Sequence, residues 1–460
     1  MSARATATEI VRRLQAAGYA AYWVGGCVRD QLRGEEPEDF DIATSALPAQ
    51  VEALFGHTIP VGRQFGVLLV VEEGRQYEVA TFRAEGDYGD GRHPGRVAFT
   101  EAQVDAQRRD FTVNGLFFDP VREELWDWVG GRADLRAGIL RTIGDANERF
   151  AEDHLRLLRA VRFAAQLNFV IESRTLAAVR HHALKLRAVS AERVRDELIK
   201  LFRAPHAGRG LGLLRDSGLL EPVLPEVAAT ANCVQSPEFH PEGSVFQHCR
   251  LMLDLLPAEA DPCLPWLILL HDVAKPVTAA RDPASGELHF YGHEKVGAQM
   301  AEGILQRLRF PRKQTDDIVA CVRHHMQFKD AARMRTGTLR RVLLRPTFGL
   351  ELELHRLDSL GSHGRLETYE FLREQSVKLA QQPVLRRPLL TGRELLALGL
   401  SPGPAVGRLL AQIRDQQLQG ELQTPREALE WVRRALGATL NSEAAAGKVR
   451  KTQGESPTQG

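Results

Sequence analysis

The 460-residue sequence lacks the marks of several specialised classes of protein. Its five cysteines form no CxxC pair, so neither a disulfide-rich secreted scaffold nor a zinc finger is indicated. The longest apolar run, Leu264–Leu270, is far shorter than a membrane span, and the first residues contain no signal-peptide core. The formal net charge is +1, so any nucleic acid would have to bind at local basic patches. We therefore expect a reduced, cytoplasmic protein with no membrane partner, while the sequence gives no oligomeric state.

The pattern along the chain predicts an α+β protein of several domains. The first part alternates helical and β-rich runs, with apolar strands expected from Val67 and from Arg75, and glycines mark the turns between them. The pattern then becomes helical, and proline and glycine near residues 232–243 mark a boundary. The predicted segments are a head with a mixed sheet (1–143), an all-helical neck and body (144–230), a helical domain that carries most of the histidines (240–380), a small helical tail (385–440) and a disordered tail (441–460).

The segment Tyr22–Thr44 begins with the pattern of a phosphate-binding turn. The pair Gly25-Gly26 follows an apolar run and precedes a helix expected to begin near Val28. Backbone N–H groups at such a turn can face an anion, and Arg29 adds a fixed positive charge. An ordinary glycine turn would have the same sequence, so the interpretation depends on the motifs that follow.

Two aspartates separated by one residue end this segment. In an extended strand Asp39 and Asp41 point to one face, while the apolar residues between and after them point to the other. Such a pair can bind divalent metal ions that activate a hydroxyl and neutralise a leaving pyrophosphate in nucleotidyl transfer. A solvent-exposed strand end is the alternative. Glu78 and Asp110 are both candidates for a third carboxylate.

The segment from Ala151 to Phe163 is predicted to form one continuous helix. Polar side chains occupy every third position, at Asp153, Arg156, Arg159 and Arg162. Each step of three residues drifts by about 60°, so the four side chains cannot all contact one flat base. We expect the aspartate and the first arginine to contact a base edge and the later arginines to contact phosphate, because a carboxylate accepts the amino group of C or A. The alternative is a salt-bridged solvent face, and Arg193 and Arg195 would brace the helix.

Together these motifs resemble those of the class II tRNA nucleotidyltransferase and poly(A) polymerase family of the polymerase-β-like superfamily. In this resemblance Arg109 matches an arginine that contacts nucleotide phosphates, Asn114 belongs to the same motif, and Gly115 stands where alanine is usual. The glycine-rich stretch 83–100 matches a flexible loop that helps to switch addition from C to A. The resemblance implies a polymerase-β-like head, Mg²⁺ at Asp39 and Asp41, and a nucleotide-binding set of Gly25, Gly26, Arg29, Arg109, Asp153, Arg156, Arg159 and Arg162.

Histidines and aspartates recur in order through the later helical region. The candidate metal ligands are His248, His271, Asp272, His293, His324, His325 and Asp358. Imidazoles and carboxylates on helices can hold one or two divalent metals, such as Mn, Fe or Ni. The order resembles that of an HD phosphohydrolase domain, in which Lys275 occupies the phosphate-stabilising position of the HDxxK motif. His240 and His363 are assigned no role.

The resemblance implies template-independent addition of C, C and A to the tRNA 3′ end from CTP and ATP, with release of pyrophosphate. The HD domain would add a phosphohydrolase activity that repairs RNA ends. Two alternatives use the same chemistry, an A-adding enzyme and a poly(A) polymerase. A third belongs to another class, an HD phosphohydrolase whose head binds nucleotides only for regulation.

Overall fold

The structure is a computed structural model that describes residues 1–86, 96–238, 240–381 and 387–436. It divides into two compact units, Met1–Val322 and Arg323–Gly460, which we describe separately. The centre of the predicted loop (87–95) and the predicted C-terminal tail (441–460) lie outside the described residues. Among the helices that are described, none combines the length and the apolar character that a membrane span requires.

A seven-stranded mixed sheet forms the centre of the head, as the sequence predicts. The strands follow the order β3-β4-β5-β2-β1-β8-β9. Their bounds are β1 (Ala21–Val24), β2 (Asp41–Thr44), β3 (Thr58–Gly62), β4 (Val67–Glu72), β5 (Arg75–Thr81), β8 (Phe117–Asp119) and β9 (Glu124–Trp126). β2 and β5 pair in parallel, and the other neighbours pair antiparallel. The register sets Val24 opposite Asp41, so the end of β1 lies beside the start of β2.

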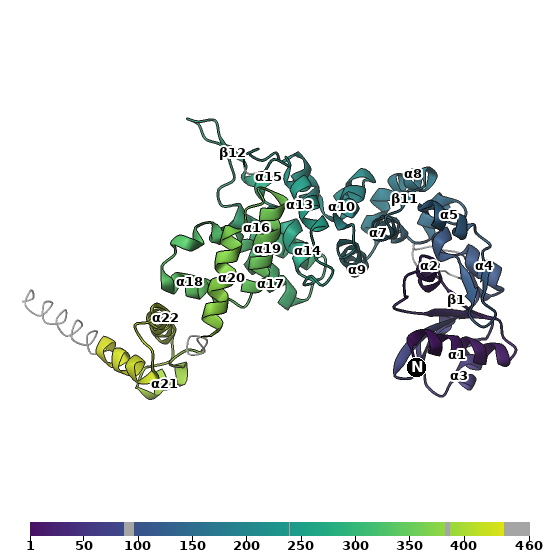
Figure 1. Cartoon of the computed structure of the whole chain (residues 1–460), viewed down its shortest axis with the longest axis horizontal. Helices are drawn as coiled ribbons and strands as arrows, with labels where there is room; N and C mark the ends of the chain where they lie inside the picture. Colours follow the sequence, from purple (N-terminus) through teal and green to yellow (C-terminus); the bar gives the residue numbers. More distant parts are fainter. Residues whose placement is uncertain (87–95, 239, 382–386, 437–460) are drawn as a thin grey trace, which may run out of the picture. The chain divides into compact units, whose positions relative to one another are not determined.

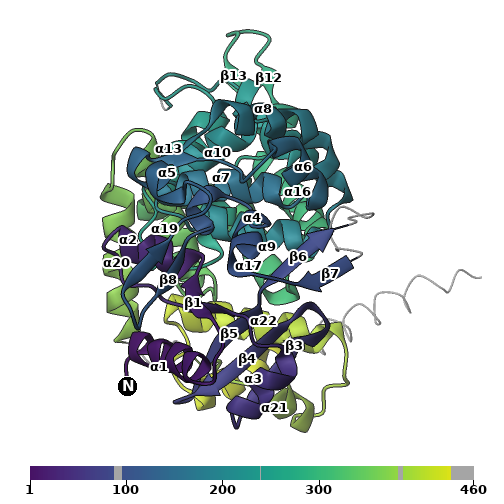
Figure 2. The same cartoon turned by 90° about the vertical axis from the view of Figure 1, so that its right-hand side faces the viewer.

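Helix α1 (Ala3–Ala16) packs against one face of this sheet (Figures 1 and 2). Its buried Ile10 and Leu14 belong to the same apolar core as Trp23 and Ile42 of the two central strands. A smaller apolar cluster that includes Phe82 lies on the other side of the strands. The remaining head helices are α2 (Gly26–Leu32), α3 (Pro48–Leu54), α4 (Ala102–Gln107) and α5 (Gly131–Ala137).

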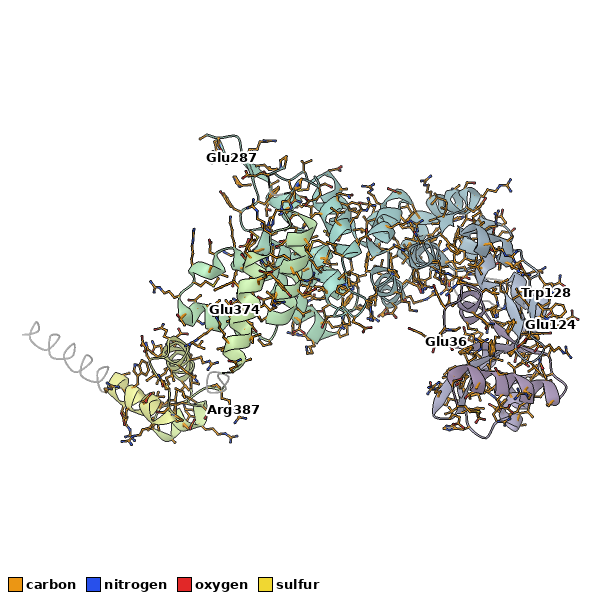
Figure 3. All side chains as sticks on the ribbon, viewed as in Figure 1. Glu36, Glu124, Trp128, Glu287, Glu374 and Arg387 are labelled. Atoms are coloured by element: carbon orange, nitrogen blue, oxygen red, sulfur yellow. The ribbon has the colours of Figure 1, made fainter. Side chains whose placement is uncertain are left out.

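The head has an exposed edge strand and a separate two-stranded sheet. The edge strand β9 and the segment after it carry Glu124 and Trp128, which lie at the outside of the head (Figure 3). Strands β6 (Arg83–Gly86) and β7 (Arg96–Phe99) pair antiparallel as a separate two-stranded sheet. These two strands are the ends of the predicted glycine-rich loop.

The neck and body are helical apart from β11 (Val170–Ile171), which pairs in parallel with β10 (Ile139–Leu140) near the end of the head segment. Their main helices are α6 (Ala146–Glu152), α7 (Arg156–Leu167), α8 (Ser173–His182), α9 (Ala191–Phe202), α10 (Ala207–Asp216), α11 (Leu220–Val223) and α12 (Pro225–Ala229). Helix α10 lies very close to α13 (Val245–Asp254) at Gly208, where an added Cβ would be 2.1 Å from the carbonyl oxygen of Arg250. Only glycine fits this crossing without displacing a backbone.

The first unit ends with five helices, and four of the candidate metal ligands lie in these helices or in the turn between two of them. The helices are α13, α14 (Leu264–Leu270), α15 (Lys275–Thr278), α16 (His293–Arg307) and α17 (Arg312–His324), which ends just beyond the boundary of the unit. Helix α14 is apolar throughout because it is buried on every side. A hairpin of β12 (Ala280–Arg281) and β13 (Leu288–His289) separates α15 from α16.

The second unit is helical. Its elements are the 3₁₀ segment η5 (His325–Arg333) and helices α18 (Thr336–Leu343), α19 (Phe348–Gly361), α20 (Glu367–Ala380), α21 (Gly392–Ala397) and α22 (Pro404–Gln419). Within this unit, Arg341 pairs with Asp415 and Arg340 donates to the carbonyl oxygen of Leu418. These contacts join α18 to the predicted helical tail.

Candidate active site

The glycine turn between β1 and α2 has the geometry that its sequence predicts. Gly25 has φ 75° and ψ −130°, a conformation that residues with a Cβ rarely adopt. An added Cβ at this position would lie 3.3 Å from Nη1 of Arg109 and 3.8 Å from Oδ2 of Asp41. The turn therefore brings the backbone close to an arginine and a carboxylate that come from distant parts of the chain.

Asp39 and Asp41 lie on the accessible side of β2 and of the segment before it, while Phe40 and Ile42 are buried. Asp41 is accessible to solvent but lies in a recess, and this partial desolvation raises the pKa of its carboxyl to about 6. The negative charge of Glu78 adds to the rise in pKa, and Arg109 opposes it. Glu78 on β5 therefore lies close enough to Asp41 for their charges to interact.

Arg109 is held in place by a residue that the sequence did not single out. Asp105 is 1% exposed and accepts from Nη2 of Arg109 at 3.1 Å and from Nε of Arg108 at 2.9 Å. Burial alone would raise the pKa of Asp105, but the two arginines lower it. The guanidinium of Arg109 also lies over the ring of Phe117, at 5.1 Å from its centroid. The spacing of four residues between Asp105 and Arg109 was the available sequence signal.

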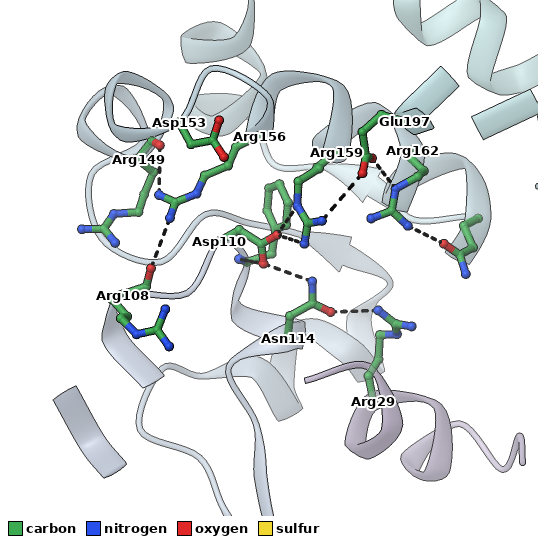
Figure 4. Close-up of polar contacts among 12 residues, drawn as sticks. Arg29, Arg108, Asp110, Asn114, Arg149, Asp153, Arg156, Arg159, Arg162 and Glu197 are labelled. Atoms are coloured by element: carbon green, nitrogen blue, oxygen red, sulfur yellow. Dashed lines mark hydrogen bonds and ion pairs between the residues drawn. The ribbon is translucent and has the colours of Figure 1, made fainter. Parts of the chain in front are cut away.

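Asp110 lies at the centre of a buried network that joins the head to the neck (Figure 4). Its Oδ2 accepts from Nη2 and Nε of Arg159 at 2.6 and 2.8 Å, and its Oδ1 accepts from Nδ2 of Asn114 at 3.1 Å. Oδ1 of Asn114 in turn accepts from Nη1 of Arg29 at 2.8 Å. Burial raises the pKa of Asp110, but the charge and hydrogen bonds of Arg159 outweigh burial and hold that pKa at about 2.

The prediction of one continuous helix over Ala151–Phe163 is wrong. α6 ends at Glu152, and Asp153 has extended backbone angles, φ −142° and ψ 108°. The Oδ1 atom of Asp153 accepts from the backbone N–H of Leu155 at 3.0 Å, so this side chain forms a local turn that ends at Leu155, the residue before α7. The carboxylate competes with the helical hydrogen bonds and breaks the helix, which a count of residues per turn does not reveal.

The three neck arginines contact acidic side chains of the first unit, and two of them share Glu197. Arg156 pairs with Glu152 and donates to the carbonyl oxygen of Arg149 at 3.1 Å. Arg162 donates from Nε to Glu197 at 2.7 Å, and Glu197 lies 3.8 Å from Nη1 of Arg159. Glu197 comes from α9, so no local spacing pointed to it.

One cavity of about 620 Å³ brings together the predicted residues of the head and neck. It is lined by Gly25, Gly26, Arg29, Asp39, Asp41, Arg109, Asp153, Arg156, Arg159 and Arg162. Further lining residues are Arg108, Asp110, Asn114, Leu155, Phe163, Gln166, Arg193 and Lys200. Basic side chains outnumber acidic ones in this lining, which suits a polyanion. Arg193 also donates to Oδ2 of Asp153 at 2.8 Å, consistent with the bracing role predicted for it.

A second polar centre lies in the first unit around Asp272. His271 donates from Nδ1 to the carbonyl oxygen of Ile268 at 2.9 Å, and His293 donates from Nδ1 to that of Phe290 at 2.7 Å. The Nε2 atom of each ring lies 3.3 Å from an oxygen of Asp272. Because Nδ1 carries the proton, the Nε2 lone pair of each ring faces the carboxylate directly. Two such electron-rich atoms repel each other unless a proton or a metal ion lies between them.

Lys275, the neighbouring histidines and burial determine the pKa of Asp272. Nζ of Lys275 lies 2.6 Å from Oδ2 of Asp272 and 2.6 Å from Oε1 of Gln235. Burial would raise the pKa of Asp272, but the charge of Lys275 and the two histidines hold it well below its ordinary value. The pKa of His293 is raised, because its bond to Asp272 outweighs burial. His248 on α13 is fully buried, and its ring centroid lies 5.7 Å from that of His271.

The other candidate metal ligands belong to the second unit. His324 ends α17, His325 begins η5, and Asp358 lies on α19. Nδ1 of His324 lies 3.5 Å from Glu351, which also accepts from Arg345 at 2.9 Å. Burial and the charge of Arg345 lower the pKa of His324.

Three sequence families match this chain. The poly A polymerase head domain matches residues 21–141, the probable RNA and SrmB-binding site of polymerase A matches residues 168–230, and the HD domain matches residues 244–378. The HD match confirms the histidine-rich domain that the sequence predicts.

Relatives cover almost the whole chain. The A-adding tRNA nucleotidyltransferase of Deinococcus radiodurans is 37% identical over 427 residues, which are 89% of this chain and 94% of that protein. The CCA-adding enzyme of Lactiplantibacillus plantarum is 47% identical over 210 residues, which are 45% of this chain and 51% of that protein. The solved CCA-adding enzyme of Bacillus stearothermophilus in complex with CTP has a TM-score of 0.70 and 28% identity, and the match covers 96% of this chain and 100% of that one.

A mixed-sheet head with paired aspartates beside an arginine-lined cavity defines a nucleotidyltransferase. The extent and identity of the matches then give the family: this chain belongs to the poly(A) polymerase and tRNA nucleotidyltransferase family, and it carries an HD domain. The predicted family and fold class are thus confirmed.

Proposed function

We propose that this chain is a CCA-adding tRNA nucleotidyltransferase, which joins C, C and A to the tRNA 3′ end from CTP and ATP and releases pyrophosphate. The observation that carries the proposal is that the aspartate pair, the glycine turn and the neck residues line the same cavity. The relatives named CCA-adding enzyme, one of them solved with CTP, support the same conclusion. Because tRNA is the substrate, we expect the protein in the cytoplasm.

The carboxylates of β2 fit a magnesium ion. Oxygen ligands suit Mg²⁺, and the negative charges of Glu78 and Asp39 already contribute to the raised pKa of Asp41, so a divalent cation would relieve their repulsion. Bound by Asp39 and Asp41, Mg²⁺ would supply activation of the 3′-hydroxyl and neutralisation of pyrophosphate. We favour Glu78 as the third carboxylate over Asp110, since Arg159 and Asn114 already occupy Asp110.

The residues of the head would hold the triphosphate while the tRNA 3′-hydroxyl attacks the α-phosphate. Arg109 lies beside the glycine turn, and its bond to Asp105 fixes its direction, so it can contact phosphate oxygens without first losing side-chain freedom. The attack breaks the bond between the α-phosphate and the bridging oxygen, and pyrophosphate leaves. No covalent enzyme intermediate is needed.

The neck would select the base. Cytosine and adenine each present an amino donor next to a ring acceptor on their pairing edge, and a carboxylate beside a guanidinium complements that pattern. Asp153 and Arg156 supply these two groups in the cavity lining. A carboxylate has about four acceptor sites. The bonds of Asp153 to Leu155 and Arg193 leave acceptor capacity for a base. Uracil and guanine would instead present a carbonyl oxygen to the carboxylate.

One assay tests the proposal. Purified protein is incubated with three tRNA substrates, ending before CCA, after the first C and after CC, with CTP and ATP supplied separately and together. Restoration of CCA on all three supports the proposal. Transfer of no nucleotide to any of them would favour the regulatory HD phosphohydrolase.

An A-adding enzyme is the second candidate. The Deinococcus radiodurans protein carries that name, and its match with this chain covers 94% of its length. It would extend only the tRNA that ends after CC, and only with ATP. A long A tail would identify a poly(A) polymerase.

We also propose that the HD domain binds one or two divalent metals, such as Mn, Fe or Ni, and hydrolyses phosphate esters at RNA 3′ ends. The side chains of this centre fit a divalent metal ion, because the Nε2 atoms of His271 and His293 face the carboxylate of Asp272. Lys275 would contact the substrate phosphate. Incubation of metal-loaded protein with a 2′,3′-cyclic phosphate and with a 2′-nucleotide tests this activity, and no hydrolysis of either would refute it.

A further inference from the structure

Two candidate metal ligands of the first unit share one structural device. His271 and His293 each donate Nδ1–H to a backbone carbonyl oxygen three residues earlier, at 2.9 and 2.7 Å. A carbonyl oxygen only accepts hydrogen bonds, so Nδ1 carries the proton in both rings. Each ring is therefore held in the tautomer whose Nε2 atom offers its lone pair to a metal.

His248 meets the same requirement with a side chain instead of a carbonyl. Its Nδ1 atom lies 2.7 Å from Oε1 of Glu242, and both side chains are buried, at 0% and 5% exposed. A carboxylate also only accepts, so this contact again puts the proton on Nδ1 and leaves Nε2 as the donor to a metal. The neighbour here is a charged carboxylate, which favours the proton on Nδ1 and makes the imidazole a better metal ligand.

The chain between the body and α13 holds Glu242 in this position. Gly243 has φ 103°, a left-handed conformation that reverses the chain directly before the Ser244 cap of α13. Backbone bonds fix both sides of the turn, from Gln235 N to the oxygen of Gly243 at 3.1 Å and from Val245 N to that of Cys233 at 3.0 Å. Glu242 is therefore part of an ordered loop.

His240 contacts the same carboxylate oxygen. Its Nδ1 atom donates to Oε1 of Glu242 at 2.8 Å, and its ring lies edge-on to that of His248, with centroids 4.9 Å apart. The His240 contact is a hydrogen bond, whereas the His248 contact is an ion pair, because its Nδ1 atom lies close to the carboxylate but outside the angular range of a hydrogen bond. The side chains of His240, Glu242 and His248 thus gather around one carboxylate, and their ligand atoms lie within 4.8 Å of one another.

We propose that Glu242 is the positioning residue of the HD metal centre, where it fixes the tautomer and direction of His248 so that Nε2 faces the metal. The inference rests on the proposed metal binding of the HD domain. It assigns a role to a residue that lies six positions before the nearest expected ligand and outside the HDxxK motif. Loss of such an orienting partner lowers metal affinity by about 10- to 100-fold.

The test measures the Ni²⁺ affinity of the full chain after transition metals have been removed from it. Ni²⁺, which imidazole binds well, is titrated by calorimetry in excess Mg²⁺, which keeps the oxygen-rich head site occupied. The variants are Glu242→Ala, Glu242→Gln and the matched control Glu238→Gln, a change at an exposed glutamate of the same loop. Nucleotide transfer by the head checks that each variant is folded.

We expect Glu242→Ala to weaken Ni²⁺ binding by about 10- to 100-fold, with Glu238→Gln unchanged. Glu242→Gln should lie between them, because an amide oxygen still accepts Nδ1–H but carries no charge. Imidazole ¹⁵N spectra of the metal-free chain, assigned with His248→Ala, should report the Nδ1–H tautomer in the wild type and a mixture in Glu242→Ala.

Two results would overturn the inference without touching the proposed metal binding. One is equal Ni²⁺ affinity of the wild type and Glu242→Ala, and the other is an Nε2–H tautomer of His248 in the metal-free wild type. A wild type that binds no Ni²⁺ would overturn both the inference and the proposed function of the HD domain.

Discussion

Replacement of Asp110 by asparagine tests the ion pair that joins the head to the neck. The carboxylate accepts from Arg159 at 2.6 and 2.8 Å and from Asn114 at 3.1 Å. Its pKa is lowered from 3.8 to about 2. This difference corresponds to about 2 kcal/mol of stability at neutral pH. We therefore expect Asp110→Asn to lower the free energy of unfolding by about 2 kcal/mol at pH 7, and Arg159 left without its main partner adds to that cost.

The destabilisation caused by Asp110→Asn should decrease as the pH falls. A carboxyl whose pKa is lower in the folded state stabilises the protein fully above its unfolded pKa, and this contribution disappears as the pH falls through the folded pKa. The difference between wild type and variant should therefore shrink to about 1 kcal/mol at pH 3 and to about 0.4 kcal/mol at pH 2.

Urea denaturation at pH 7, 4 and 3, followed by tryptophan fluorescence, measures this difference, and the first transition is compared because the chain has several domains. The control is Asp216→Asn, which removes an exposed pair with Arg215 and should change stability by less than about 0.5 kcal/mol. A destabilisation that is equal at pH 7 and pH 3 would refute the ion-pair argument.

The remaining predictions concern packing and the site. Gly208→Ala should destabilise the protein by about 1–3 kcal/mol in urea titrations, because its Cβ would lie 2.1 Å from a backbone oxygen of α13. Gly303→Ala, with no atom within 4 Å, should stabilise α16 by about 0.5–1 kcal/mol, and the same sign for both would contradict the packing argument. Asp39→Ala should abolish nucleotide addition, and its melting temperature should not change because the lost carboxylate is exposed. Retained transfer would show that Asp39 is not a metal ligand. Asp105→Asn should raise KM for CTP by about tenfold by releasing Arg109, and an unchanged KM would mean that Arg109 needs no support.

Local sequence patterns were sufficient to predict the strand of the two aspartates and the glycine turn of the head. The two aspartates alternate with buried Phe40 and Ile42, because neighbouring side chains of a strand point to opposite faces. Gly25 adopts the positive φ that a sharp turn requires. These features depend on residues close in the chain, so the sequence reveals them directly.

Local patterns failed where a side chain competes with the backbone. Asp153 fits a helical spacing of three, but its carboxylate accepts the N–H of Leu155 and ends the helix there. The residue still lines the predicted cavity, where its other carboxylate oxygen accepts from Arg193 of another helix. The predicted domain boundaries and the roles of the site residues stay predictions.

The sequence by itself determined the family, the mixed-sheet head, the helical body and the presence of an HD domain, because these follow from periodicity and from motifs that are short and contiguous. Only the tertiary structure decided the partners of the charged groups. Asp110 binds Arg159 from 49 positions away, Arg162 binds Glu197 from 35 positions away, and Asp105 holds Arg109. The energy of a buried charge depends on the neighbours that surround it in space, and no spacing along the chain specifies those neighbours.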